Sequence, residues 1–185
     1  MIEVVVEDRA WIRALPDAEA LATAAAEAAL AEGAGPPPPP RGPPLPEGEE
    51  NRSCTSPPPL GEGNREAAEG AVVVLLTDDE AVRGLNARFR GKDAPTNVLS
   101  FPAPPNPERH LGDLALAFDV CAREAAEQGK PFEHHLQHLV VHGVLHLLGY
   151  DHMSDDEAEA MEGLERIVLA GLGAPDPYQA GPKGP

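Results

Sequence analysis

Three histidines in the C-terminal half of the chain have the spacing of ligands to a single metal ion. His142 and His146 are four residues apart, so on a helix they lie one turn apart on the same face. Gly149 follows and can adopt the left-handed conformation that ends a helix, which lets the chain double back and bring in His152. Three imidazoles leave the fourth tetrahedral position open for water, as in catalytic zinc sites. The spacing therefore predicts one zinc ion per chain.

The residue after the first histidine indicates which reaction such a metal would serve. The spacing is that of the zinc-protease signature His-Glu-x-x-His-x-x-Gly-x-x-His, in which the glutamate is the general base. This chain has Gly143 at that position. Peptide hydrolysis by the usual route then lacks its proton acceptor, whereas a metal can still lower the pKa of a bound water or polarise a phosphoryl oxygen. Metal-dependent hydrolysis is the prediction, and a zinc peptidase is a disfavoured alternative.

The segment that carries these histidines is predicted to be a central, buried helix over residues 132–148. Apolar residues cover nearly its whole surface, and they are Leu136, Leu139, Val140, Val141, Val144, Leu145, Leu147 and Leu148. His138 continues the same row one turn before His142. It is either a group that supports a ligand or an alternative ligand. We favour the first, because only the downstream three histidines have the turn that brings in a third nitrogen.

The remaining periodic segments predict an α+β fold. Short apolar or alternating runs indicate about four strands, at residues 2–6, 72–76, 97–101 and 114–118. Start and stop signals indicate helices at about residues 16–33 and 119–129. Two further helices are expected to begin at capping boxes, one at residues 77–80 with the helix ending near residue 88, and one at residues 154–157. The fold expected is a small mixed sheet with packed helices, with the metal site on the central buried helix and in the turn after it.

The length of 185 residues suits one domain, which we expect to span residues 1–172. Residues 34–70 interrupt it with eleven prolines and almost no large apolar side chains. Such a segment cannot bury enough surface to offset its ordering entropy, so we expect a disordered insertion there. Residues 173–185 are expected to form a flexible C-terminal tail.

Composition restricts the compartment and the partners. Two cysteines without metal-type spacing, no signal peptide and no run of about 20 apolar residues predict a cytoplasmic protein with no membrane partner. The net charge of −17 argues against a general nucleic-acid binder. Residues 83–109, however, carry five basic and two acidic side chains, a net +3. This local basic patch is compatible with a substrate that contains phosphate.

Three stretches together resemble the YbeY family of bacterial endoribonucleases, also described as rRNA maturation factors. They are residues 85–102 (LNARFRGKDAPTNVLSFP), 111–114 (LGDL) and 142–152 (HGVLHLLGYDH). The resemblance covers roughly residues 71–171 well. It implies a zinc-dependent endoribonuclease specific for single strands, which acts in maturation of the 3′ end of small-subunit rRNA and in ribosome quality control. The implied partners are single-stranded RNA, ribosomal RNA or the small subunit, and no DNA.

The resemblance also implies roles for particular residues. The three histidines would be the metal ligands, and Arg90 would be the catalytically important arginine, since a guanidinium offers a planar fork to phosphate oxygens. Arg88 and Lys92 would hold the RNA backbone. Water and the ribose 2′-hydroxyl both stay open as the nucleophile. A non-catalytic ribosome assembly factor that uses zinc only for stability is a further alternative.

Overall fold

The computed structural model describes residues 1–34 and 70–179. Apart from its two end residues, the predicted insertion at 34–70 lies outside the described residues, as does the predicted tail from residue 180 onward. The described elements follow one another as β1 (Ile2–Val6), α1 (Ala10–Ala14), α2 (Ala18–Glu32), β2 (Ala71–Thr77), α3 (Asp79–Arg90), β3 (Val98–Pro102), β4 (His110–Ala117), α4 (Phe118–Glu127), α5 (Phe132–Leu147) and α6 (Asp155–Gly171).

The four strands form one mixed sheet in the order β1-β2-β4-β3. β1 and β4 both run parallel to β2, and β3 pairs antiparallel with β4. The expected α+β fold with a mixed sheet of about four strands is confirmed. β4 begins at His110, four residues before the predicted start. Its polar first residues and the irregular pairing beside Gly112, whose φ is 145°, break the apolar pattern by which strands are found in a sequence.

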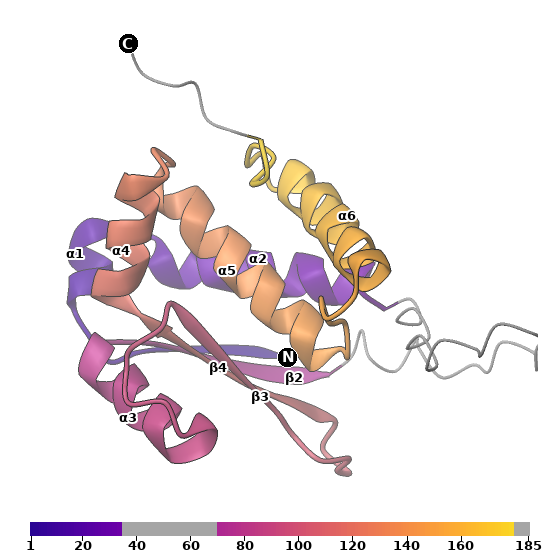
Figure 1. Ribbon diagram of the computed structural model, residues 1–185, viewed down its shortest axis with the longest axis horizontal. Coiled ribbons are helices and arrows are strands. Elements are labelled where there is room, and N and C mark those ends of the chain that lie inside the picture. The colour runs from indigo at the N-terminus through magenta and orange to yellow at the C-terminus, as the bar shows by residue number, and fades with distance from the viewer. Residues whose placement is uncertain (35–69, 180–185) are drawn as a thin grey trace, which may run out of the picture.

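Most of the helices cover one face of the sheet. Figure 1 shows α5 running diagonally across that face, with α2 behind it and α6 beside it, while α3 lies alone on the opposite face. Trp11 anchors the packed side: it is fully buried, its ring stacks on Phe132 and meets the edge of Phe118, and its Nε1 donates to the carbonyl of Thr77 at 3.0 Å. This core fixes the N-terminal end of α5 against the sheet.

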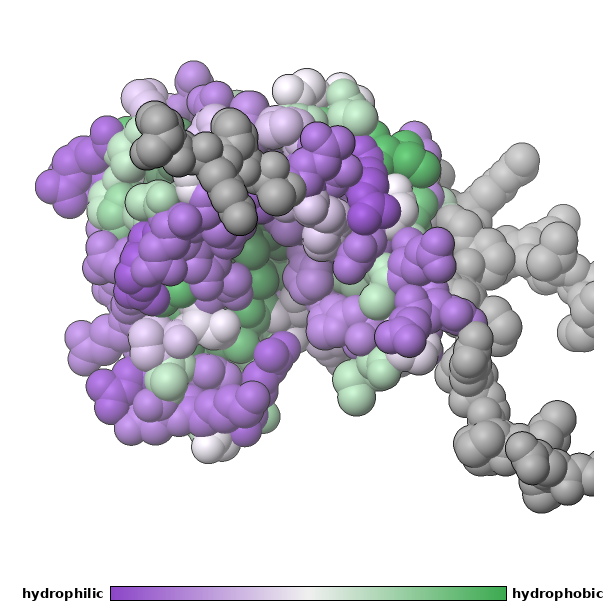
Figure 2. All heavy atoms as spheres, turned by 45° about the horizontal axis from the view of Figure 1, so that its top comes forward, coloured by the Kyte–Doolittle hydropathy of each residue, from purple (hydrophilic) through white to green (hydrophobic). Residues whose placement is uncertain are grey.

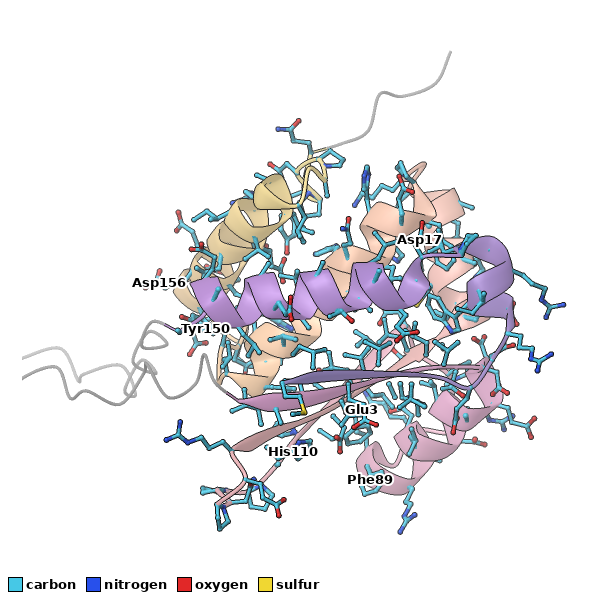
Figure 3. The ribbon with its side chains drawn as sticks, turned by 180° about the vertical axis from the view of Figure 1, so that it is seen from behind. Glu3, Asp17, Phe89, His110, Tyr150 and Asp156 are labelled. Carbon is cyan, nitrogen blue, oxygen red and sulfur yellow. The ribbon has the colours of Figure 1, made fainter. Side chains whose placement is uncertain are left out.

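The opposite face is only partly covered. Phe89 of α3 and Phe101 of β3 meet edge to face with ring centroids 5.2 Å apart. Beside them lies an apolar hollow of about 660 Å³, which extends to His110 on β4; Figure 3 shows Phe89 and His110 on this side. Elsewhere, hydrophilic residues predominate on the face drawn in Figure 2. Within residues 1–34 and 70–179, no helix has the length and apolar character needed to cross a bilayer.

The N-termini of α6 and α3 are capped in different ways. The capping box at 154–157 is present: Ser154 Oγ accepts from the backbone N–H of Glu157, whose carboxylate accepts from the N–H of Ser154. The prediction of a capping box at residues 77–80 is wrong. Asp78 caps α3 by accepting from the N–H of Ala81, because Thr77 still belongs to β2 and its hydroxyl donates to Glu7. The first box sets the start of α6, and the position of α6 matters for the metal centre.

Candidate metal centre

The structure brings the three predicted histidines together. His142 and His146 lie one turn apart near the end of α5, and Gly149 then turns the chain with a φ of 91°. The turn expected at this glycine is therefore present. It leads into the loop that carries His152 before α6 begins. One ring nitrogen from each histidine lies within 4.8 Å of the others, so the three can converge on one ion.

Hydrogen bonds fix the tautomers of His142 and His146. Nδ1 of His146 lies 2.9 Å from the carbonyl oxygen of Tyr150, and Nδ1 of His142 lies 2.8 Å from Oε1 of Glu165. A carbonyl and an ionised carboxylate only accept hydrogen bonds, so both imidazoles carry their proton on Nδ1. The two Nε2 atoms then present lone pairs to each other at 3.1 Å. Neither can donate to the other, and a cation bound between them would relieve the repulsion.

The donor set fits zinc. Two nitrogens bound at about 2.0–2.1 Å to a tetrahedral ion lie about 3.3 Å apart, close to the 3.1 Å between the Nε2 atoms of His142 and His146. The ring of His152 has its centroid 5.7 Å from that of His142 and 5.1 Å from that of His146. His152 is exposed, whereas the other two are partly buried. The site is therefore closed on the α5 side and open to solvent on the side of the loop.

The surroundings favour a neutral imidazole at His146 and an ionised carboxylate at Glu165. Burial lowers the pKa of His146, and the neighbouring His142 lowers it further. Burial raises the pKa of Glu165, but hydrogen bonds from His138, His142 and Tyr178 lower it more, to about 2. Glu165 is thus an acceptor at neutral pH, while His146 keeps a free lone pair. Neutral imidazoles are the form that binds a metal.

Gly143, the residue that takes the place of the protease glutamate, has no room for a side chain. A Cβ at this position would lie 2.8 Å from Cδ2 of Leu114 on β4 and 3.3 Å from the hydroxyl of Ser100 on β3. A side chain at this position would therefore fit only if Leu114 and Ser100 moved, so the glutamate of the protease signature is not accommodated on this backbone.

Arg90 is the last residue of α3, and the structure places it across from the histidines. It lines a hollow of about 450 Å³ together with Ser100, Pro102, His146 and the loop from Gly149 to His152. Its Nη2 lies 3.5 Å from the carbonyl oxygen of Ser100. A group bound in this hollow can contact the histidine cluster from one side and a guanidinium from the other.

Arg88 and Lys92 are close to Arg90 in sequence but do not line the hollow in the described part of the chain. The guanidinium of Arg88 lies over the ring of Phe89, 5.1 Å from its centroid, and Lys92 is exposed. The loop that carries Lys92 is fastened to α3, because Arg83 makes a two-pronged contact with Asp93 at 2.6 and 2.8 Å. The loop that carries Lys92 is therefore held close to α3.

Three residues of the centre are missing from the sequence predictions: Glu165, Tyr178 and the carbonyl of Tyr150. Glu165 could have been noticed, because it is a charged residue on the inner row of α6, four residues after buried Met161 and three before buried Val168. His138, favoured above as a supporting group, lies outside the histidine cluster, with its Nε2 3.2 Å from Oε2 of Glu165. Residues 173–179, assigned above to a tail, include buried Ala174 and the Tyr178 hydroxyl bonded to Glu165.

Comparison with known proteins identifies the family. The family model described as "Endoribonuclease YbeY" matches residues 61–173. The chain belongs to the YbeY family. The matched region contains Arg90 and all three histidines, so the expected resemblance is confirmed over the segment that forms the hollow.

Curated relatives agree with this assignment. A protein of Rhodopseudomonas palustris strain BisA53 is 58% identical over 120 residues, which cover 61% of this chain and 70% of the relative. A Chelativorans protein is 59% identical over 115 residues, covering 60% of this chain and 71% of the relative. A protein of Nitrobacter winogradskyi is 53% identical over 123 residues, which cover 62% of this chain and 65% of the relative. All three are named endoribonuclease YbeY.

A solution structure of a Thermotoga maritima protein is also similar. It is 21% identical, with a TM-score of 0.49, and the match covers 97% of this chain and 99% of the other.

Proposed function

We propose that this protein is a zinc-dependent endoribonuclease that cuts single-stranded RNA. One observation carries the proposal: two members of the three-histidine cluster, His146 and His152, line the same hollow as Arg90. The names of the curated relatives support ribonuclease activity. Ribosomal RNA is the proposed substrate, with the 3′ end of the small-subunit RNA as the processing site and ribosome quality control as a second role. The proposed compartment is the cytoplasm.

In this proposal, the residues in and around the hollow have different roles. When bound, zinc supplies positive charge that stabilises the charge developing on the scissile phosphate. Arg90 adds a planar pair of N–H donors to the phosphate oxygens from the opposite side. The carbonyl of Tyr150 and the carboxylate of Glu165 keep the protons of His146 and His142 on Nδ1, so that both Nε2 atoms stay available. Arg88 and Lys92, which are not among the residues that line the hollow, are proposed to hold the RNA backbone beyond the cut.

Metal analysis combined with an RNA cleavage assay tests this function. The purified protein is expected to hold one zinc per chain and to cut single-stranded RNA but not an RNA duplex. A chelator should abolish cleavage, added zinc should restore it, and His146→Ala should lose both zinc and activity. Digestion of casein without digestion of RNA would support a zinc peptidase instead. Zinc and ribosome binding without any cleavage would support a non-catalytic assembly factor.

A further inference from the structure

Glu165 is a buried acid with an unusual set of partners. It lies on α6 and is fully buried. Its Oε1 accepts from Nδ1 of His142 at 2.8 Å, and its Oε2 accepts from Nε2 of His138 at 3.2 Å and from the hydroxyl of Tyr178. Burying a carboxylate is costly unless hydrogen bonds compensate it. Here three side chains donate to the carboxylate, and one of them belongs to the histidine cluster.

We propose that Glu165 is a positioning residue of the metal centre and that Tyr178 holds it in place, so that the C-terminal segment is part of the zinc site. This inference rests on the proposed zinc site. Through its bond to Nδ1, Glu165 turns Nε2 of His142 toward the ion and makes that nitrogen a better donor. Tyr178 and His138 saturate the other oxygen and fix the rotation of the carboxylate.

The two helical ligands differ in how they are held. His146 is oriented by the backbone carbonyl of Tyr150, four residues further along, so its support is local and does not depend on any side chain. His142 is oriented by a side chain 23 residues away on another helix. The geometry of His142 therefore depends on the docking of α6 against α5, whereas that of His146 depends only on the turn at Gly149.

The segment that carries Tyr178 is tied down at several points. The buried side chain of Ala174 follows the end of α6, and the backbone N–H of Ala174 donates to the carbonyl of Leu169 at 2.9 Å. Lys130, in the loop before α5, donates to the carbonyl of Pro177 at 2.6 Å. The guanidinium of Arg166 lies over the ring of Tyr178, 5.0 Å from its centroid. These contacts present the hydroxyl to Glu165 from outside the region matched by the family model, which ends at residue 173.

Zinc affinity of the full chain, measured by competition with a chromophoric chelator, tests the inference. Glu165→Gln keeps the shape but removes the charge and one acceptor, and it should weaken zinc binding by about 10–100-fold. Tyr178→Phe removes a single hydroxyl and should weaken binding several-fold. Glu159→Gln is the matched control, because Glu159 lies on the same helix and its side chain is exposed. This control should bind zinc like the parent.

A spectroscopic measurement separates positioning from general stability. With cobalt(II) in place of zinc, the visible absorption of the parent and of Glu159→Gln should be the same, whereas Glu165→Gln should change in band position or intensity. If Glu165→Gln and Tyr178→Phe lower only the melting temperature and leave zinc affinity and the cobalt spectrum unchanged, the positioning role is overturned. If Glu165→Gln does not fold, Tyr178→Phe decides alone. A parent protein that binds no zinc overturns the metal site itself, and this inference with it.

Discussion

Gly143 and Leu114 are in such close contact that no side chain fits between α5 and β4 at this point. A Cβ on Gly143 would lie 2.8 Å from Cδ2 of Leu114 and 3.0 Å from its Cδ1. This approach seats α5 on the sheet directly beside His142. The glycine therefore serves the placement of the cluster as well as excluding a protease-type base.

Gly143→Ala should destabilise the protein although alanine favours helices. The helix preference contributes about 1 kcal/mol in favour of alanine, whereas overpacking of a core costs about 1–3 kcal/mol. We expect a net loss on the order of 1 kcal/mol in the free energy of unfolding, measured in urea. Gly163→Ala on α6 is the control: its Cβ would meet nothing within 4 Å, so it should stabilise by about 0.5–1 kcal/mol. Equal stabilisation by both variants would show that α5 can move away from β4.

Arg90→Ala should slow RNA cleavage far more than it weakens RNA binding. Loss of one preorganised donor to a developing charge typically costs about 10²–10³ in rate. Zinc content should not change, and Arg90→Lys should recover only part of the rate, because an ammonium lacks the planar fork. Arg88→Ala is the comparison for the cleavage step: its guanidinium lies over Phe89 outside the hollow, so this variant should weaken RNA binding but cut bound RNA at about the parent rate. Single-turnover cleavage at parent rates by Arg90→Ala would exclude contact with the phosphate.

Lys92→Ala should weaken RNA binding without a comparable effect on the cleavage step. A lysine that contacts the backbone of a single strand contributes about 0.7 to the slope of log affinity against log salt, so the variant should show a slope smaller by that amount. Titrations at several salt concentrations measure it. Arg13→Ala removes the same charge from α1 and should leave the slope unchanged. A slope reduced equally by both variants would point to net charge as the cause.

Acid should destabilise the metal-free protein in two stages. Burial lowers the pKa of His135 and His146 below 6.5. The unfolded chain therefore takes up these protons first, and the free energy of unfolding falls as the pH drops below about 6.5. Glu165, with a pKa of about 2 in place of 4.5, stabilises the fold above pH 4.5. Its contribution, on the order of 3 kcal/mol, is lost as the pH falls from 4.5 toward 2.

Urea unfolding in the presence of a chelator, from about pH 8 to about pH 3, measures both stages. Glu165→Gln should remove the second stage, and Glu159→Gln should keep both. A stability that does not change between neutral pH and about pH 5 would contradict the first stage, because it would mean that the two histidines take up protons equally in the folded and unfolded chains.

The parts of the site that the sequence predicted are those set by local structure. The one-turn spacing of His142 and His146 and the turn at Gly149 follow from the periodicity of a helix and the conformational freedom of glycine. The support for these ligands does not follow in the same way. The bond from His142 to Glu165 depends on how α6 docks, and the position of Arg90 depends on the sheet that separates α3 from α5. Such contacts are tertiary, and no spacing rule along the chain encodes them.

The bond between Tyr178 and Glu165 also has a consequence for the order in which the site is completed during synthesis. A ribosome makes the chain from the N-terminus, so α5 and its histidines leave the exit tunnel before α6, and residue 178 leaves after both. Until that segment has emerged and folded back, Glu165 lacks one of its three partners and His142 lacks a fixed support. A nascent chain still attached to the ribosome thus carries an unfinished histidine cluster, and the RNA nearest to it is the RNA of the ribosome that is making it.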